Sequence, residues 1–182
     1  GSLKELHGMT DPNQMPERDT VVVMHESEKV RAVLARMLRK VLPGFNVDMS
    51  ASPEEVTAKL AGEVGKKVAL VLAKIDNTIK NEALLRPFYS SSGSARLANV
   101  PLVALSQDLP IAIERHEVTA EQLTRLGIDG VLEIPYLERL RAVVSMAIMK
   151  RSEIFGQIEE AKRKEIMTSF FENYVELAKT WL

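Results

Sequence analysis

The sequence predicts an α/β protein in which a parallel sheet is covered by helices on both faces. The first reason is the run at residues 68–76, which begins with six consecutive apolar residues and shows no polar alternation. Such a run is typical of a strand that is buried on both faces. The second reason is that apolar runs alternate with segments of helical periodicity along the chain. Alternating strands and helices imply parallel strands joined by right-handed crossovers.

The elements before this central strand have clear boundaries. Residues 20–24 are β-branched and apolar, which favours a buried first strand. Ser27 can cap the helix that follows, and a Pro-Gly pair at 43–44 ends that helix. Residues 45–49 alternate between apolar and polar side chains and are predicted as the second strand. A Ser-Pro pair at 52–53 then opens a second helix with a cap and a proline in the first turn.

The elements after the central strand follow the same alternation. Residues 80–88 are predicted as a third helix and residues 100–106 as a fourth buried strand. The Thr-x-x-Gln pattern at 119–122 resembles a capping box and predicts the start of a fourth helix. Residues 130–134 form a short fifth strand in this interpretation. The commonest five-stranded arrangement of such units is the flavodoxin-like sheet with strand order 2-1-3-4-5, and we expect it here.

Composition indicates an ordinary soluble domain. The 182 residues are 46% hydrophobic and 27% charged, which suffices for one core and an additional element. A formal net charge of -1 does not favour non-specific binding to nucleic acid or to an anionic membrane. The chain lacks cysteine, which excludes disulfides and thiolate metal sites. Because no membrane-spanning run or signal peptide is evident, we expect a cytoplasmic protein without membrane contact.

The chain divides into three regions on this pattern. Residues 1–19 contain Gly and Pro but little apolar periodicity, so we expect a flexible leader with the remnant of a purification tag at its start. Residues 20–149 hold the repeated strands and helices. Residues 150–182 are expected to be a helical extension. After Tyr136 the chain contains no proline, and only Gly156 interrupts the helical pattern, so we expect one long helix from Tyr136 onward.

Three separated segments share a more specific pattern. Residues 22–27 join a strand to an acidic residue, with Arg31 in the helix behind it, and residues 102–106 form a strand that ends in serine. Residues 127–136 read Gly-Ile-Asp-Gly-Val-Leu-Glu-Ile-Pro-Tyr. Together they resemble the CheY-like receiver domain of two-component response regulators over about residues 20–149. The resemblance implies the flavodoxin-like fold and a role in phosphorelay signalling.

A working receiver, as the resemblance implies, needs an acceptor aspartate, two acids that hold magnesium, a hydroxyl and a lysine. In this sequence the acid pair falls on His25 and Glu26, the acceptor on Ala73, the hydroxyl on Ser106 and the lysine on Ile134. Only Glu26 and Ser106 keep suitable chemistry. The resemblance therefore implies a pseudo-receiver domain that lacks the phosphoacceptor, is no enzyme, and has no cofactor or metal.

Other residues near this degenerate pocket leave alternatives open. Lys74 either projects into the vacated pocket or lies on the surface with its charge in water. Pro135 completes the pocket after the fifth strand. Asp76 is a rival phosphoacceptor if the central strand ends two or three residues later than expected. In that alternative the chain would be an atypical receiver that is still phosphorylated.

The helical extension is expected to mediate protein contacts. It contains a narrow apolar seam typical of two-helix packing, followed by a wider aromatic face. A helix beyond a complete domain has nothing of its own to bury such a face against, so it requires a dimer, a folded-back packing or an adjoining output domain. We expect a homodimer or contact with a protein partner through these residues: Ile154, Ile158, Ala161, Phe170, Phe171, Tyr174 and Trp181.

The leading hypothesis is a signalling module that acts by phosphorylation-independent protein contact. An alternative is the pseudo-receiver part of an RNA-binding antiterminator. Residues 157–162 of this chain faintly resemble a helix of that class of protein. Too few residues remain for its RNA-binding domain, and the basic cluster at 162–164 is expected to be a solvated face, so nucleic acid is not an expected partner. A nucleotide- or flavin-binding protein is the third hypothesis, although no glycine-rich loop follows Val23.

Overall fold

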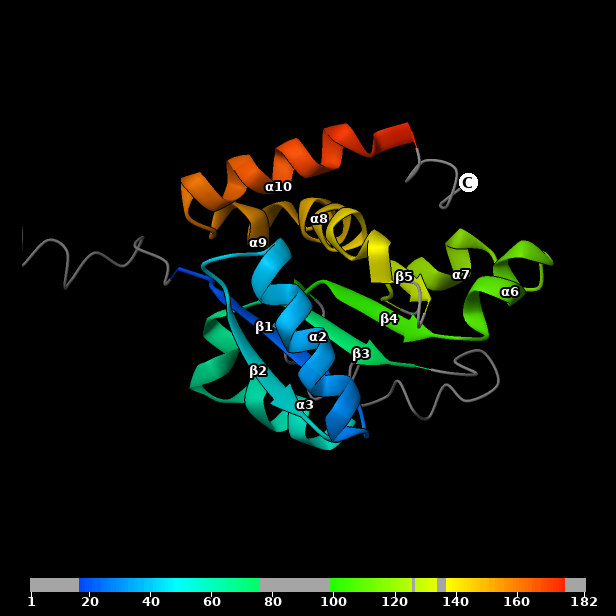
Figure 1. Cartoon of the computed structure of the whole chain (residues 1–182), viewed down its shortest axis with the longest axis horizontal. Helices are drawn as coiled ribbons and strands as arrows, with labels where there is room; N and C mark the ends of the chain where they lie inside the picture. The colour runs from blue at the N-terminus through cyan, green and yellow to red at the C-terminus, as the bar shows by residue number, and fades with distance from the viewer. Residues whose placement is uncertain (1–16, 76–98, 126, 134–136, 176–182) are drawn as a thin grey trace, which may run out of the picture.

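The computed structural model describes residues 17–75, 99–125, 127–133 and 137–175. Within these residues five parallel strands form one sheet in the order β2-β1-β3-β4-β5, which confirms the predicted flavodoxin-like fold (Figure 1). The predicted third helix at residues 80–88 lies outside the described residues. The strands are β1 (Thr20–Met24), β2 (Asn46–Ser50), β3 (Val68–Lys74), β4 (Leu102–Ser106) and β5 (Gly130–Glu133).

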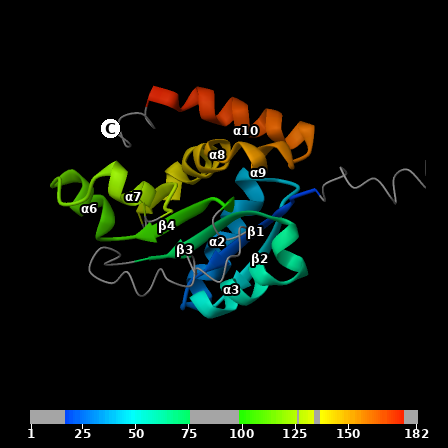
Figure 2. The same cartoon turned by 180° about the vertical axis from the view of Figure 1, so that it is seen from behind.

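Helices cover both faces of the sheet (Figures 1 and 2). One apolar cluster joins the sheet to α2, α8, α9 and α10, and a second joins its other face to α3, α6 and α7. In the part of the chain that the structure describes, no helix is both long and apolar enough to cross a membrane. The helical elements are α2 (Glu28–Val41), α3 (Pro53–Ala61), η1 (Glu63–Lys66), α6 (Leu109–Glu114), α7 (Ala120–Arg125), η3 (Leu137–Arg139), α8 (Leu140–Lys150), α9 (Ser152–Gly156) and α10 (Glu160–Glu172).

The predicted helix starts are confirmed by their capping hydrogen bonds. Ser27 Oγ accepts the Val30 N–H at 3.4 Å, and Ser52 Oγ accepts the Glu55 N–H at 3.3 Å. In the capping box before α7, Thr119 Oγ1 accepts the backbone N–H of Gln122 at 3.2 Å while the Gln122 side chain accepts the Thr119 N–H at 2.9 Å. These caps satisfy N–H groups that no helix can satisfy internally.

The central strand has the buried environment that its sequence predicts. All of β3 before Lys74 is buried, with exposures of 0–2%. Met24 of β1 and Ala104 of β4 lie beside Ala73 of β3 in the parallel register. The carboxyl ends of β1, β3 and β4 therefore finish at one edge of the sheet, where open α/β proteins place their functional residues.

The C-terminal segment differs from the prediction. The expected single helix is broken twice, at Arg151 and again at residues 157–159, and α10 turns back to pack on α8 (Figures 1 and 2). Ile154, Ile158 and Ile166 are 1%, 3% and 1% exposed and belong to the same apolar cluster as the strands. The prediction of one continuous helix is therefore wrong, because the periodic isoleucines are buried against the domain itself.

An internal ion pair holds the first break. The Asp129 carboxylate, just before β5, accepts two hydrogen bonds from Arg151, Nε to Oδ1 and Nη2 to Oδ2, each at 3.1 Å. Its Oδ2 also accepts the Leu102 N–H at 3.0 Å. Asp129 is 8% exposed. Arg151 thus leaves the helical conformation, with φ −106° and ψ 81°. Its side chain is bound to Asp129, which lies just before β5 and also binds the first residue of β4.

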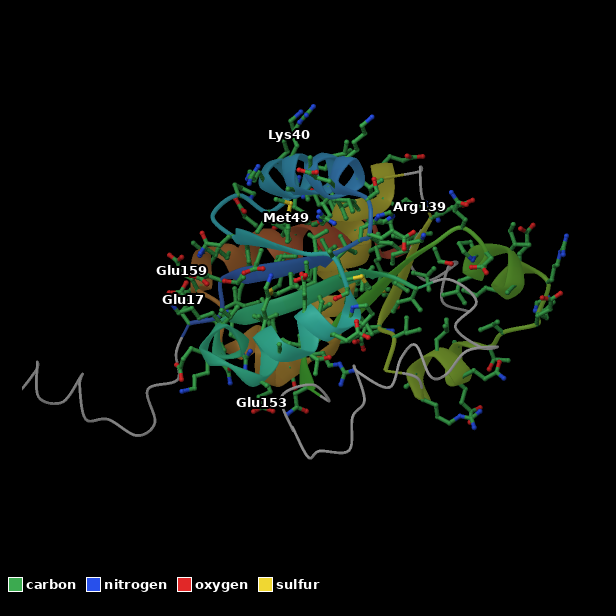
Figure 3. All side chains as sticks on the ribbon, turned by 90° about the horizontal axis from the view of Figure 1, so that it is seen from below. Glu17, Lys40, Met49, Arg139, Glu153 and Glu159 are labelled. Carbon is green, nitrogen blue, oxygen red and sulfur yellow. The ribbon has the colours of Figure 1, made fainter. Side chains whose placement is uncertain are left out.

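The second break is held by residues of the N-terminal segment. The backbone N–H of Arg18 donates to the Gln157 carbonyl at 2.8 Å, and Arg18 Nη1 donates to the Val68 carbonyl at 2.7 Å. Lys162 at the start of α10 forms ion pairs of 3.4 Å with both Glu17 and Glu159, whose side chains lie side by side in Figure 3. The turn into α10 is thereby attached to the amino end of the sheet.

Candidate functional site at the carboxyl edge of the sheet

The loop between β1 and α2 is held by internal hydrogen bonds. His25 is 7% exposed. Its backbone N–H donates to the Ser50 carbonyl at 3.1 Å, and its ring Nδ1 accepts the backbone N–H of Ser27 at 2.9 Å. Arg31 Nη1 donates to the carbonyls of His25 at 2.7 Å and Glu26 at 3.3 Å. His25 therefore stabilises the loop, and its Nδ1 lone pair is already used.

Lys74 is the residue of β3 that reaches this loop. Ala73 is completely buried and belongs to the cluster on the α3 face, so its methyl group points into the core. The next side chain, Lys74, extends from the end of the strand and forms an ion pair with Glu26, Nζ to Oε1. The assignment of the acceptor position to Ala73 stays a prediction. Because side chains alternate along a strand, Ala73 and Lys74 point to opposite sides, and it is Lys74 that contacts the acid Glu26.

The ion pair shapes the charge of the site. The hydrogen bond from Lys74, with the charge of its ammonium, holds the pKa of Glu26 below its ordinary value. The nearby His25 adds a smaller effect in the same direction. Glu26 is therefore an ionised carboxylate at neutral pH, and its charge is compensated by a lysine from a different strand. The Lys74 side chain is 30% exposed and its ammonium is paired with Glu26, whose side chain is 71% exposed.

Ser106 has a local structural role at the end of β4. It is 1% exposed, its Oγ donates to Asp108 Oδ1 at 2.7 Å, and the same oxygen accepts the Leu109 N–H at 3.0 Å. The Ser106 hydroxyl thus accepts an N–H from the first residue of α6 and donates to the Asp108 carboxylate. Asp108 was missed in the sequence interpretation, although an acid two residues after a strand-ending serine is a pattern that allows this bond.

The described residues do not fit the magnesium ion that the receiver resemblance implies. Magnesium binds carboxylate and water oxygens in near-octahedral geometry. At this edge Glu26 supplies a carboxylate that is already paired with an ammonium, and His25 Nδ1 accepts a backbone N–H. Across the described ranges, no three His, Cys, Asp or Glu side chains are grouped so as to hold a metal. Asp76, Ile134 and Pro135 lie outside the described residues.

A second candidate surface lies at the C-terminal half of α10 and just beyond its end at Glu172. Met167 and Phe171 of α10 are 38% and 64% exposed, and Tyr174 and Val175 after the helix are 55% and 66% exposed. Phe170 is half-buried against the core and makes edge-to-face contacts with Phe171 and Tyr174, with ring centroids 5.4 and 5.6 Å apart. We call Met167, Phe171, Tyr174 and Val175 the α10 apolar surface.

The predicted interaction residues divide into four groups, one of which is the half-buried Phe170. Ile154 and Ile158 are buried in the core of the chain, so the two-helix seam they were expected to form packs internally. Ala161, Phe171 and Tyr174 are exposed, whereas Trp181 lies outside the described residues. Among the described members, Ala161, Phe171 and Tyr174 are the ones exposed enough for a second protein to reach.

The basic cluster at 162–164 makes contacts within the chain. The Lys162 ammonium lies 5.3 Å from the centre of the Phe45 ring, besides its two ion pairs with glutamates. Arg163 Nη1 donates to the Gly156 carbonyl at 3.4 Å, and Lys164 lies 3.9 Å from Glu160 on the same helix. These contacts give the RNA-binding alternative no support.

The strand order defines the class: this is a doubly wound α/β protein with the flavodoxin-like fold. Among solved structures, the chain is similar to a protein described as pilus assembly-related from Burkholderia pseudomallei, with a TM-score of 0.54, 15% identity, and 80% of this chain and 93% of that chain covered. It is also similar to a fusion that carries the trimeric coiled coil of yeast Spc42, with a TM-score of 0.55, 15% identity, and 91% and 99% covered.

Several other similar structures are response-regulator receiver domains. One is the N-terminal domain of a response regulator receiver protein from Methanoculleus marisnigri, with a TM-score of 0.45, 18% identity, and 66% of this chain and 88% of that chain covered. At these identities the similarity shows the fold alone. No family model and no curated protein matches the chain.

Proposed function

We propose that this chain is a signalling module of the two-component type that acts by binding proteins and does not itself transfer or accept a phosphoryl group. The observation that carries the proposal is the Lys74–Glu26 ion pair. An acceptor must lie beside the acid that shares its metal ion, and the β3 side chain beside Glu26 is an ammonium. A protonated amine has no lone pair with which to attack phosphorus, and its charge repels magnesium.

Protein contact is assigned to the α10 apolar surface, and the occupant we propose is a second copy of the chain. Exposed residues of α10 recur at intervals of three to four, from Lys164 through Met167 to Phe171, which is the spacing of a two-helix seam. Tyr174 continues this interval just beyond the end of the helix. An antiparallel pair centred on Thr168 places Lys164 of each copy opposite Glu172 of the other. An adjoining output domain is the competing occupant.

Sedimentation equilibrium of the full chain, with and without acetyl phosphate and magnesium, tests both parts of the proposal. We expect dimers whose dissociation constant is the same in both conditions. The double variant Phe171→Ser/Tyr174→Ser should weaken the dimer at least about tenfold, because aromatic anchors dominate interface free energies. Val33→Ser is the matched control, since Val33 is a 44% exposed apolar residue on α2 and should leave the dimer unchanged.

Two results would contradict the proposal in different ways. A chain that stays monomeric at all concentrations would exclude the second copy as the occupant. Association that appears only with acetyl phosphate and magnesium would exclude phosphorylation independence, and would direct attention to Asp76 as the acceptor.

A further inference from the structure

We propose that the Lys74 ammonium takes the place of the divalent cation at the carboxyl edge of the sheet, so that the site contains its own permanent monovalent cation. The inference deepens the proposed function and rests on it, because both require that β3 presents no acceptor carboxylate beside Glu26. The inference goes further than the proposed function in one respect. It states that charges of the chain itself prevent divalent cations from binding at this site, and that one substitution should allow them to bind.

The position of Lys74 is the first argument. Because Met24 and Ala73 are neighbours in the β1–β3 register, Lys74 at the end of β3 lies beside the β1–α2 loop. Lys74 Nζ contacts Glu26 Oε1 across these two elements, which are 48 residues apart in the chain. The Lys74 side chain is 30% exposed and the Glu26 side chain 71% exposed, so solvent reaches the pair. A metal ion would have access to this position if the ammonium were absent.

The other acceptor atoms of the loop are the second argument. Arg31 Nη1 binds the carbonyl oxygens of His25 and Glu26 at 2.7 and 3.3 Å. His25 Nδ1 accepts the Ser27 N–H at 2.9 Å. The His25 and Glu26 carbonyl oxygens, His25 Nδ1 and Glu26 Oε1 therefore each accept from a donor of the chain itself. A divalent ion that bound these atoms would compete with donors that are already in place.

Charge is the third argument. With Lys74 paired, Glu26 contributes no net attraction for a cation, and the Arg31 guanidinium adds a second fixed positive charge on the same loop. A divalent ion entering this site would meet two cations at short range. Reversing the charge at position 74 replaces the repulsion with a second carboxylate next to Glu26, and carboxylate count is a main determinant of divalent-cation affinity. Reversing the charge at position 74 should therefore be enough for the site to bind a divalent cation.

Titration of the full-length chain with Mn²⁺ in a calorimeter tests the inference, using Mn²⁺ itself as the probe. Wild-type protein and Glu26→Gln should bind Mn²⁺ equally weakly. Lys74→Asp should bind it at least about tenfold more tightly than wild type, because two carboxylates then face each other. The double variant Lys74→Asp/Glu26→Gln should lose this gain. Lys74→Met, which removes the ammonium and adds no carboxylate, should show an intermediate, Glu26-dependent affinity.

The exposed pair of Lys66 and Glu63, 3.2 Å apart, supplies the matched control. Lys66→Asp also places two acids together on the surface, but it lies at η1, away from the β1–α2 loop, and should not gain the same affinity. An equal gain in Lys66→Asp would overturn the inference, as would a gain in Lys74→Asp that does not depend on Glu26. If Lys74→Asp does not fold, Lys74→Met decides the matter, and no gain in that variant would then refute the inference.

The inference and the proposed function fail separately. Glu26-dependent Mn²⁺ binding by the wild-type protein, without any phosphorylation, would refute the built-in cation and leave the proposed function standing. Phosphorylation of wild-type protein without Glu26-dependent Mn²⁺ binding would refute the proposed function and leave the built-in cation standing.

Discussion

Asp129→Ala is expected to lower the free energy of unfolding by about 3–5 kcal/mol, the range for breaking one side of a buried ion pair. The Asp129 side chain is 11% exposed and that of Arg151 27% exposed, so the remaining guanidinium would stay partly buried without its partner carboxylate. The substitution also removes the acceptor of the Leu102 N–H. Urea denaturation followed by circular dichroism measures the loss.

Two further measurements distinguish this ion pair from an ordinary surface contact. In the exposed pair of Glu63 and Lys66, Glu63→Ala should change the stability by less than about 1 kcal/mol. Adding Arg151→Ala to Asp129→Ala should cost less than the sum of the two single variants. If Asp129→Ala is as mild as Glu63→Ala, then the ion pair does not hold the break between α8 and α9.

The same carboxylate affects a neighbouring lysine. Burial lowers the pKa of Lys150, the charge of Asp129 opposes this shift, and Arg151 adds to it. Loss of the Asp129 carboxylate should therefore lower the pKa of Lys150 further. The pKa of Lys150 thus gives the Asp129 variants a local readout in addition to stability.

Gly65→Ala should destabilise the fold by about 3 kcal/mol or more, which is the upper part of the range for overpacking. Gly65 is a buried residue of η1, and a β-carbon at this position would lie 2.0 Å from the Leu60 carbonyl oxygen and 2.7 Å from its carbonyl carbon. These are backbone atoms of the preceding helix and cannot rotate away as a side chain can. The turn that leads from α3 into β3 would have to move. Thermal unfolding of the two proteins measures the difference.

Gly156→Ala is the matched control for this prediction. A β-carbon at Gly156 meets no atom within 4 Å, and the residue ends α9. Alanine should therefore be neutral or stabilising by about 0.5–1 kcal/mol, because it restricts the unfolded chain and favours the helix. If Gly65→Ala and Gly156→Ala changed the stability equally, η1 would accommodate the added β-carbon without cost, and the prediction would be contradicted.

Much of the fold was predictable because its signals are local. The apolar run of β3, the β-branched residues of β1 and the capping patterns at Ser27, Ser52 and Thr119 each depend on side chains within a few residues. Alternation of strands and helices then limits the strand order to few solutions. For the same reason the helical character of the C-terminal segment was correctly predicted.

The first break in that segment could not be predicted, because its cause is not local. No proline or glycine lies within four residues of Arg151, and the residue leaves the helix through a bond to Asp129, 22 residues earlier. The contact between Lys74 and Glu26 could not be predicted either, because it joins residues 48 positions apart that meet only once β3 lies beside β1. The assignment of the acceptor position to Ala73 stays a prediction.

Intact-mass spectrometry of the full chain after incubation with acetyl phosphate and magnesium tests the central claim most directly. Because the β3 side chain beside Glu26 is the Lys74 ammonium, we predict that the mass of the wild-type protein does not change. A stoichiometric gain of one phosphoryl group that disappears in Asp76→Asn would contradict the account and establish a phosphorylated receiver.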